Sequence, residues 1–139
     1  MAEGIDELGR RVAQRFIVRD SRPGARNLAG KMGVEIVERE EAPPAQRGLR
    51  SEYQADPPRI TLYRGPLDRL AARIHISQRF DMMNCDLDEV HIAHELFHHV
   101  EARGRFGEMG AKEVERAAHA FAQELLDLTF NPAELSQVT

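Results

Sequence analysis

The chain lacks several features that mark other classes of protein. It has no tryptophan, and its single cysteine, Cys85, excludes an internal disulfide. No apolar run approaches the roughly 18 residues of a membrane-spanning helix, and the first residues are acidic where a secretory leader would be basic. We therefore expect a cytoplasmic protein without a membrane partner, in which Cys85 is a small packing residue.

An excess of basic charge is also missing. The 19 Lys and Arg residues are outnumbered by 23 Asp and Glu residues, and the formal net charge of −4 gives no general attraction to nucleic acid. The arginines between Arg10 and Arg26 could form a local basic patch, but a solvated helix face is the simpler interpretation. With 139 residues, 42% of them hydrophobic, the chain can bury one core. We expect a single domain, residues 1–139, that binds no nucleic acid; the composition does not indicate an oligomeric state.

The most informative segment contains the sequence His94-Glu95-Leu96-Phe97-His98, which is an H-E-x-x-H motif. On a helix the two histidines lie one turn apart on the same face, where both imidazoles can bind one divalent ion. Glu95 lies beside them and can accept a proton from water that the ion activates. The motif therefore predicts a Zn²⁺ site with its own general base, as in metal-dependent hydrolases.

The surroundings of the motif predict a helix from Leu87 to Arg103. Asp86 followed by Glu89 has the form of a capping box, and Gly104 can end the helix. At about 100° per residue the motif residues fall on one face, opposite an apolar face made of Val90, Ala93, Leu96, Phe97 and Val100. We expect the apolar face to pack in the core and the other face to line a cleft, together with His91, which lies just before His94 on that face.

A catalytic zinc site usually takes three protein ligands, so one more is needed. The extended form of the motif would place a third histidine six residues after His98, but that position holds Gly104. The third ligand must therefore come from a second helix. The apolar stripe of Ala111–Leu128 predicts such a helix.

Three side chains of this second helix could bind the ion. Glu113 points away from the apolar stripe, whereas Glu115 and His119 share a face at its border. We predict Glu115 as the third ligand and His119 as a residue that touches a ligand or the substrate. The reverse assignment stays open, and Glu113 is the third choice.

The two predicted helices resemble those of the ImmA/IrrE-type zinc metallopeptidases. The H-E-x-x-H motif is followed by Glu115-Arg116-Ala117-Ala118-His119-Ala120-Phe121-Ala122-Gln123-Glu124-Leu125-Leu126, which is similar to that family's second-helix pattern E-x-E-A-N-x-F-A-x-x-L-L. Ala117 replaces the second Glu of the pattern, and His119 replaces its Asn. The resemblance covers about the C-terminal third of the chain. It implies a zincin-like fold and zinc-dependent hydrolysis of a protein or peptide substrate.

The rest of the chain predicts a scaffold of helices and a few strands. Helices are predicted over Ile5–Val18, from Pro23 to near Gly33 and over Leu67–Ile76, and strands over Val34–Val37 and Ile60–Tyr63. The proline-rich segment Glu38–Pro58 should be a loop, part of which, Leu49–Tyr53, can pair as a hairpin arm. The predicted fold class is α+β, zincin-like and mostly helical, with a small sheet beside the H-E-x-x-H helix.

Substrate contacts are predicted less specifically. The resemblance implies that Ile60–Tyr63 is an edge strand that holds an extended peptide, although an ordinary strand without substrate contact is an equal alternative. Tyr63, His91, His119 and Tyr53 are candidates for a side chain that contacts the scissile carbonyl. Phe106 and Met109, in the glycine-punctuated segment 104–110, could form a lid over the cleft or belong to a simple turn.

We therefore expect zinc-dependent peptide hydrolysis, with Zn²⁺ held by His94, His98 and Glu115. Glu95 would be the general base. The alternatives are a non-catalytic metal-binding sensor, in which a partner fills the open position of the ion, and an interaction domain without metal. The intact Glu95 favours the enzyme over the sensor, because a purely structural site needs no base.

Overall fold

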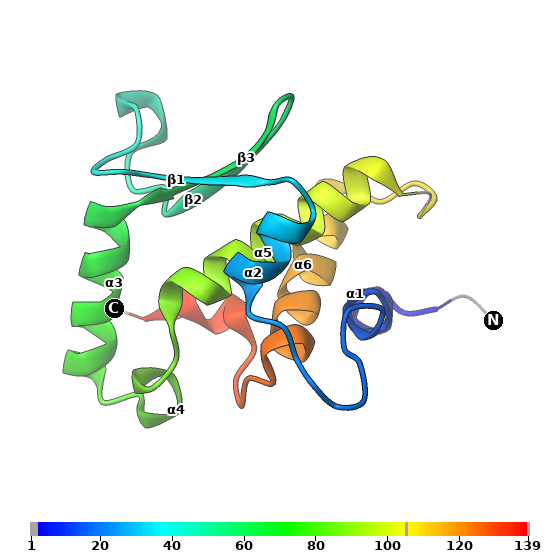
Figure 1. Ribbon diagram of the computed structural model, residues 1–139. Coiled ribbons are helices and arrows are strands. Elements are labelled where there is room, and N and C mark those ends of the chain that lie inside the picture. Colours follow the sequence, from blue (N-terminus) through cyan, green and yellow to red (C-terminus); the bar gives the residue numbers. More distant parts are fainter. Residues whose placement is uncertain (1–2, 105, 139) are drawn as a thin grey trace.

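The computed structural model describes residues 3–104 and 106–138 of the chain (Figure 1). In chain order its elements are α1 (Ile5–Gln14), α2 (Ala25–Lys31), β1 (Glu35–Arg39), η1 (Pro44–Gln46), β2 (Ser51–Ala55), β3 (Pro58–Tyr63), α3 (Arg64–Ser77), α4 (Phe80–Met83), α5 (Leu87–Arg103), α6 (Ala111–Leu126) and η2 (Pro132–Gln137). The structure is α+β and mostly helical, with a small three-stranded sheet, as predicted. None of the helices in the described ranges has the length and apolar character needed to cross a membrane.

The sheet has the strand order β1-β3-β2, with β1 parallel and β2 antiparallel to β3. The hairpin arm predicted within the proline-rich segment is confirmed as β2. The prediction that Ile60–Tyr63 forms an edge strand was wrong. These residues belong to β3 at the centre of the sheet, because β2 pairs with them on the side that β1 leaves open. The edge strand that packs against α5 is β2.

Helix α5 begins and ends at the predicted residues, Leu87 and Arg103. The Asp86 side chain accepts a hydrogen bond of 3.2 Å from the Glu89 backbone N–H, as expected of an N-cap residue. Glu89 does not complete the predicted capping box. Its carboxylate instead accepts hydrogen bonds of 2.7 and 2.9 Å from the first two backbone N–H groups of α2, which has no side-chain cap of its own. One acidic residue of α5 therefore fixes the start of α2.

Helix α5 lies between the sheet and α6 (Figure 1), and most of its predicted apolar face packs in the main core. Its apolar face is buried in a core shared with α1, α2, β3 and α6, through Ile92, Ala93, Leu96 and Phe97. Val90, which was predicted on the same face, packs in a smaller core instead and lines a cleft. The motif histidines lie on the opposite face. The smaller core, under α3 and α4, includes the half-buried thiol of Cys85, and burial raises the pKa of that thiol, which agrees with a packing role.

Helix α1 packs closely on α6 although the two lie at opposite ends of the sequence. A Cβ placed on Gly9 would lie 2.2 Å from the carbonyl oxygen of Ala117, so only glycine permits this approach. An ion pair of 3.2 Å between Asp6 and Arg116 accompanies it. Helix α1 is shorter than the predicted Ile5–Val18, because the chain turns after Gln14. Its packing fixes α6, and with it the side chains that α6 presents to α5.

Candidate metal centre

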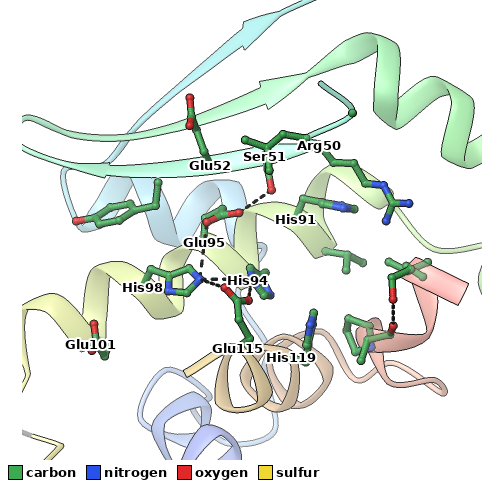
Figure 2. Close-up of a pocket in the computed structure, with 18 of the residues that line it drawn as sticks. Arg50, Ser51, Glu52, His91, His94, Glu95, His98, Glu101, Glu115 and His119 are labelled. Carbon is green, nitrogen blue, oxygen red and sulfur yellow. Dashed lines mark hydrogen bonds and ion pairs between the residues drawn. The ribbon is translucent and has the colours of Figure 1, made fainter. Parts of the chain in front are cut away.

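The two motif histidines project from adjacent turns of α5 into a cleft (Figure 2). The Nε2 atoms of His94 and His98 lie 3.4 Å apart, and their rings meet edge to face with centroids 5.1 Å apart. Both side chains are half-buried. The helical spacing of the motif therefore brings two ligand nitrogens to one point, as predicted.

Glu115 brings a carboxylate from α6 to the same point (Figure 2). Its Oε2 lies 2.8 Å from His94 Nε2, and its Oε1 lies 3.4 Å from His98 Nε2. Contact with His94, and then with His98, holds the pKa of Glu115 well below its usual range. Burial lowers the pKa of His98, but the nearby Glu115 and Glu95 carboxylates raise it, and the net shift is upward. Glu115 is thus an ionised carboxylate between two imidazoles.

The third choice from the sequence, Glu113, takes no part in this cluster. Its carboxylate accepts a hydrogen bond of 3.0 Å from the Gly110 backbone N–H at the start of α6. This is the expected consequence of its position on the helix, which turns it away from Glu115.

The spacing of the three side chains suits a zinc ion. Two ligand atoms about 2.0–2.1 Å from a tetrahedral ion lie about 3.3–3.4 Å from each other, and the two histidine Nε2 atoms lie 3.4 Å apart. Glu115 contacts the histidines through different oxygens, with Oε1 3.4 Å from His98 Nε2 and Oε2 2.8 Å from His94 Nε2, the second being the distance of a direct hydrogen bond. Two imidazoles and a carboxylate are also a ligand set of catalytic zinc sites. The residue types present therefore suit Zn²⁺, and His94, His98 and Glu115 could hold it.

His119 lies one turn after Glu115 on α6, and its ring centroid is 4.6 Å from that of His94. Two groups of three side chains have possible ligand atoms that all lie within 4.8 Å of one another, and they are His94, Glu95 and His98, and His94, Glu115 and His119. The buried Nδ1 of His119 has no hydrogen-bond partner among the described residues. Burial, with the neighbouring His94, lowers the pKa of His119 to about 4. His119 is therefore a neutral imidazole beside the ligands, and it stays the alternative third ligand.

Glu95 is buried beside the histidines and is only 7% exposed. Its Oε1 lies 4.0 Å from His98 Nε2, and its Oε2 accepts a hydrogen bond of 2.7 Å from the Ser51 hydroxyl at the start of β2. Ser51 was not among the predicted site residues, because a serine in a proline-rich segment carries no signal of its own. Only the pairing of β2 with β3 brings it over α5.

His91 lines the cleft, as predicted. Its Nδ1–H donates a hydrogen bond of 2.7 Å to the Leu87 carbonyl oxygen, and burial lowers the pKa of His91 to about 4. His91 therefore presents a neutral imidazole one turn away from the predicted ligands.

The two tyrosines offered as substrate contacts lie in different places. Tyr53 lines the cleft, and its hydroxyl lies 2.7 Å from Nδ1 of the buried His99. Tyr63 is buried in the sheet and is not among the described residues that line the cleft. Its hydroxyl donates to Glu52, and burial raises the pKa of Tyr63 to about 12. In this structure Tyr63 is a sheet residue without access to the metal centre.

The predicted lid is not formed. Phe106 and Met109 are partly buried against the main core, and neither is among the residues that line the cleft. The Phe106 ring stacks on Phe97 at 6.3 Å, and the Arg15 guanidinium lies 5.7 Å from its centroid. The described part of the segment between α5 and α6 thus packs on the apolar side of α5, as a connector between helices.

The cleft has a volume of about 740 Å³, within the range of ligand pockets. Residues 48–53 form one continuous wall of the cleft. Its floor is formed by the exposed face of α5 together with Glu115 and His119 of α6, and η2 closes one end. Figure 2 shows Ser51 and Glu52 above the metal-binding side chains, with Arg50 towards the η2 end. The candidate metal centre therefore lies on the floor of an open cleft under an edge strand.

No family model matches the chain, and comparisons with curated proteins and with solved structures gave no match. The resemblance to ImmA/IrrE-type peptidases therefore stays a prediction from the sequence. The function proposed below rests on the geometry of the cleft.

Proposed function

We propose that the chain is a zinc-dependent peptidase with a zincin-like fold. The observation that carries the proposal is the convergence of His94, His98 and Glu115 in one cleft, next to a buried carboxylate, Glu95. Three protein ligands would leave one position of a tetrahedral ion open for water. A purely structural site would not need Glu95 as a base. The resemblance of the two helices to ImmA/IrrE-type peptidases agrees with this function.

Zinc held by these side chains would act as a Lewis acid on a peptide carbonyl and lower the pKa of a water molecule towards neutrality. Glu95 would act as the base. Its Oε1 faces the histidines, 4.0 Å from His98 Nε2, so it can accept a proton as the water oxygen attacks the carbonyl carbon. It then returns that proton to the amine nitrogen when the C–N bond breaks. Ser51 holds the other oxygen of the carboxylate and limits its rotation.

His119 is the best placed of the predicted partners for the scissile carbonyl. It shares the cleft with the three ligands, and its low pKa keeps it neutral, so that a ring N–H can donate to the negative charge that develops on the carbonyl oxygen. His91 and Tyr53 line the same cleft, but their polar atoms already contact Leu87 and His99.

The substrate would lie along β2 as an extended peptide. Of the described strands, β2 pairs only with β3, and residues 48–53 line the cleft consecutively. Main-chain hydrogen bonds can add a peptide to such an edge. The role that the sequence analysis gave to Ile60–Tyr63 is therefore transferred to β2.

The test compares wild-type protein with Glu95→Gln after reconstitution with zinc, by metal analysis and by hydrolysis of a mixture of short unstructured peptides. The amide is nearly isosteric with the carboxylate but cannot take the proton. We expect one equivalent of zinc in both proteins and hydrolysis by the wild type alone. Glu7→Gln, an exposed charge-matched change on α1, is the control and should leave hydrolysis intact.

Other outcomes would contradict the proposal. Undiminished hydrolysis by Glu95→Gln would remove Glu95 from the mechanism. Bound zinc without hydrolysis in the wild type would favour the metal-binding sensor. A protein that takes up no zinc would be an interaction domain.

A further inference from the structure

Arg50 differs from the other arginines in its surroundings. It is half-buried and lines the cleft, and it is the only Arg or Lys among the described residues that do so. Its backbone carbonyl accepts a hydrogen bond of 2.9 Å from the Tyr63 N–H, which ties its main chain to β3. Figure 2 shows its side chain running beside His91, towards the part of the cleft that η2 borders. The position of this guanidinium is thus set by the sheet.

The Arg50 guanidinium makes no ion pair or hydrogen bond with any described residue. Arginines such as Arg64, Arg69 and Arg79 each pair with carboxylates. Burial lowers the pKa of Arg50, and the nearby positive charge of Arg73 lowers it further. A partly desolvated cation without a partner is unfavourable, and a bound anion would relieve that cost.

Charge is distributed unevenly along the cleft. Glu101 lines the end beyond His98, whereas Arg50 lies at the other end, beside the neutral imidazole of His91. Glu52, two residues after Arg50 on the wall of the cleft, accepts a hydrogen bond from the Tyr63 hydroxyl. His91 and Glu101 are separated by ten residues of α5, or about 15 Å at 1.5 Å per residue. The two motif histidines lie between them. A peptide in the cleft would therefore meet a positive group on one side of the metal ligands and a negative group on the other.

The spacing of His91 and His94 along α5 gives a scale for where the anion would lie in the substrate. His91, beside Arg50, precedes His94 by three residues, or about 4.5 Å along the helix. An extended peptide advances about 3.3 Å per residue, so a group bound by Arg50 would belong to a residue about one or two positions from the bond at the metal. The planar guanidinium is suited to a carboxylate, which it can bind through two N–H groups.

We propose that Arg50 forms a carboxylate-binding subsite, and that the preferred substrates carry a carboxylate within about two residues of the cleaved bond. This inference rests on the proposed peptidase function. The carboxylate has two possible sources, an Asp or Glu side chain and the free C-terminus of a peptide. Both present the same group to Arg50.

The test measures kcat/KM for two sets of matched peptides with wild-type protein, Arg50→Met and Arg50→Lys. In the first set the C-terminus is amidated and Glu is exchanged for Gln at each position around the cleaved bond. The peptides of the second set contain no acidic side chain, and their C-terminus lies close to the cleaved bond. In this set each peptide with a free C-terminal carboxylate is compared with the same peptide carrying a C-terminal amide. The set that shows the preference identifies the source of the carboxylate.

The wild type should prefer the carboxylate member of a pair by about 10- to 100-fold, as expected for charged hydrogen bonds. Arg50→Met keeps an apolar stem but should remove the preference, and Arg50→Lys should keep only part of it. Arg47→Met, an exposed change in the loop before β2 and outside the cleft, should retain the full preference. Wild-type hydrolysis without any preference, or a preference that survives in Arg50→Met, would overturn the subsite.

A binding measurement separates failure of the subsite from failure of the peptidase. The same peptides are titrated into two zinc-loaded proteins, Glu95→Gln and the double variant Glu95→Gln/Arg50→Met. Any contact between the peptide carboxylate and zinc is the same in the two proteins, so a difference in affinity reports on Arg50. If no wild-type hydrolysis is found, the peptidase proposal fails. An affinity for the carboxylate peptides that falls about tenfold or more in the Arg50→Met protein would still support the subsite. Equal affinities would overturn it.

Discussion

Ser51 donates a hydrogen bond of 2.7 Å to Glu95 and so joins the edge strand β2 to α5, the helix of the H-E-x-x-H motif. Each of the two residues is only 7% exposed. The bond occupies Oε2 of the carboxylate and leaves Oε1 on the side of His98. The orientation of the proposed base therefore depends on a residue about 44 positions away in the sequence.

Removal of this hydroxyl should lower turnover. In Ser51→Ala the buried Glu95 carboxylate loses a donor and can rotate, so we expect kcat to fall by about tenfold or more, with little change in KM or in zinc content. Ser51→Thr keeps the hydroxyl and should restore most of kcat. A drop in thermal stability with unchanged kcat would show that Ser51 supports only the fold.

The third ligand can be identified by zinc titration against a competing chelator. Glu115 contacts both motif histidines, so Glu115→Ala should reduce zinc affinity far more than His119→Ala, for which we expect a loss of about 10- to 100-fold. Glu113→Ala is the control, because its carboxylate contacts only the start of α6. The opposite order for the first two variants would make His119 the ligand.

Two glycine substitutions should have opposite effects on stability, because Gly9 lies where α1 packs on α6 and Gly30 lies in open space on α2. Gly9→Ala places a methyl group against the Ala117 carbonyl, and we expect the free energy of unfolding to fall by about 2–3 kcal/mol. It should also weaken zinc binding, because α6 must shift and carries Glu115. Gly30→Ala in α2 meets no atom within 4 Å and should raise stability by about 0.5–1 kcal/mol. Denaturant unfolding checks both, and an equal effect of the two changes would contradict the close approach.

Low pH should weaken the ion pair between Arg64 of α3 and Asp88 of α5. Arg64 binds both oxygens of Asp88 at 2.9 and 3.0 Å, and this contact lowers the pKa of Asp88. A carboxylate with a depressed folded-state pKa stabilises the fold above its unfolded pKa of about 3.9, and that contribution disappears as the pH falls through the folded value.

The variant that tests this is Asp88→Asn. At pH 7 it should be less stable than the wild type by about 1 kcal/mol, a small value because both side chains are partly exposed. The difference should shrink as the pH falls below about 4. Asp20→Asn, at an exposed carboxylate without an ion pair among the described residues, should show no such pH-dependent difference. A constant difference for Asp88→Asn at all pH values would contradict the linkage.

The local features of α5 could be predicted because neighbouring residues determine them. Asp86 and Gly104 mark the ends of α5, and the spacing of His94 and His98 puts them on one face whatever the rest of the chain does. The face of α6 that carries Glu115 follows from its own apolar stripe. Within one helix, the side-chain period alone predicts the geometry.

Features that depend on distant pairing could not be predicted in the same way. The sequence indicates a hairpin arm at Leu49–Tyr53 but not that this arm becomes an edge of the sheet beside β3. That pairing decides which strand is the edge and which residues, Ser51 and Arg50 among them, reach the cleft. Glu89 was expected to cap its own helix, but the uncapped start of α2 offered two backbone donors instead. Such competition between partners is visible only when the elements are assembled.

Because a substrate would dock on the open edge of β2, the conformational stability of the substrate itself would affect the rate of cleavage. A strand edge accepts only an extended main chain, so a segment already folded into a helix or a sheet would have to open before it could dock. For a stable target the cleavage rate would then follow the small population of locally unfolded molecules rather than the sequence at the cleaved bond. Damaged or unfolded chains would be cut first, while native proteins with the same sequence would survive.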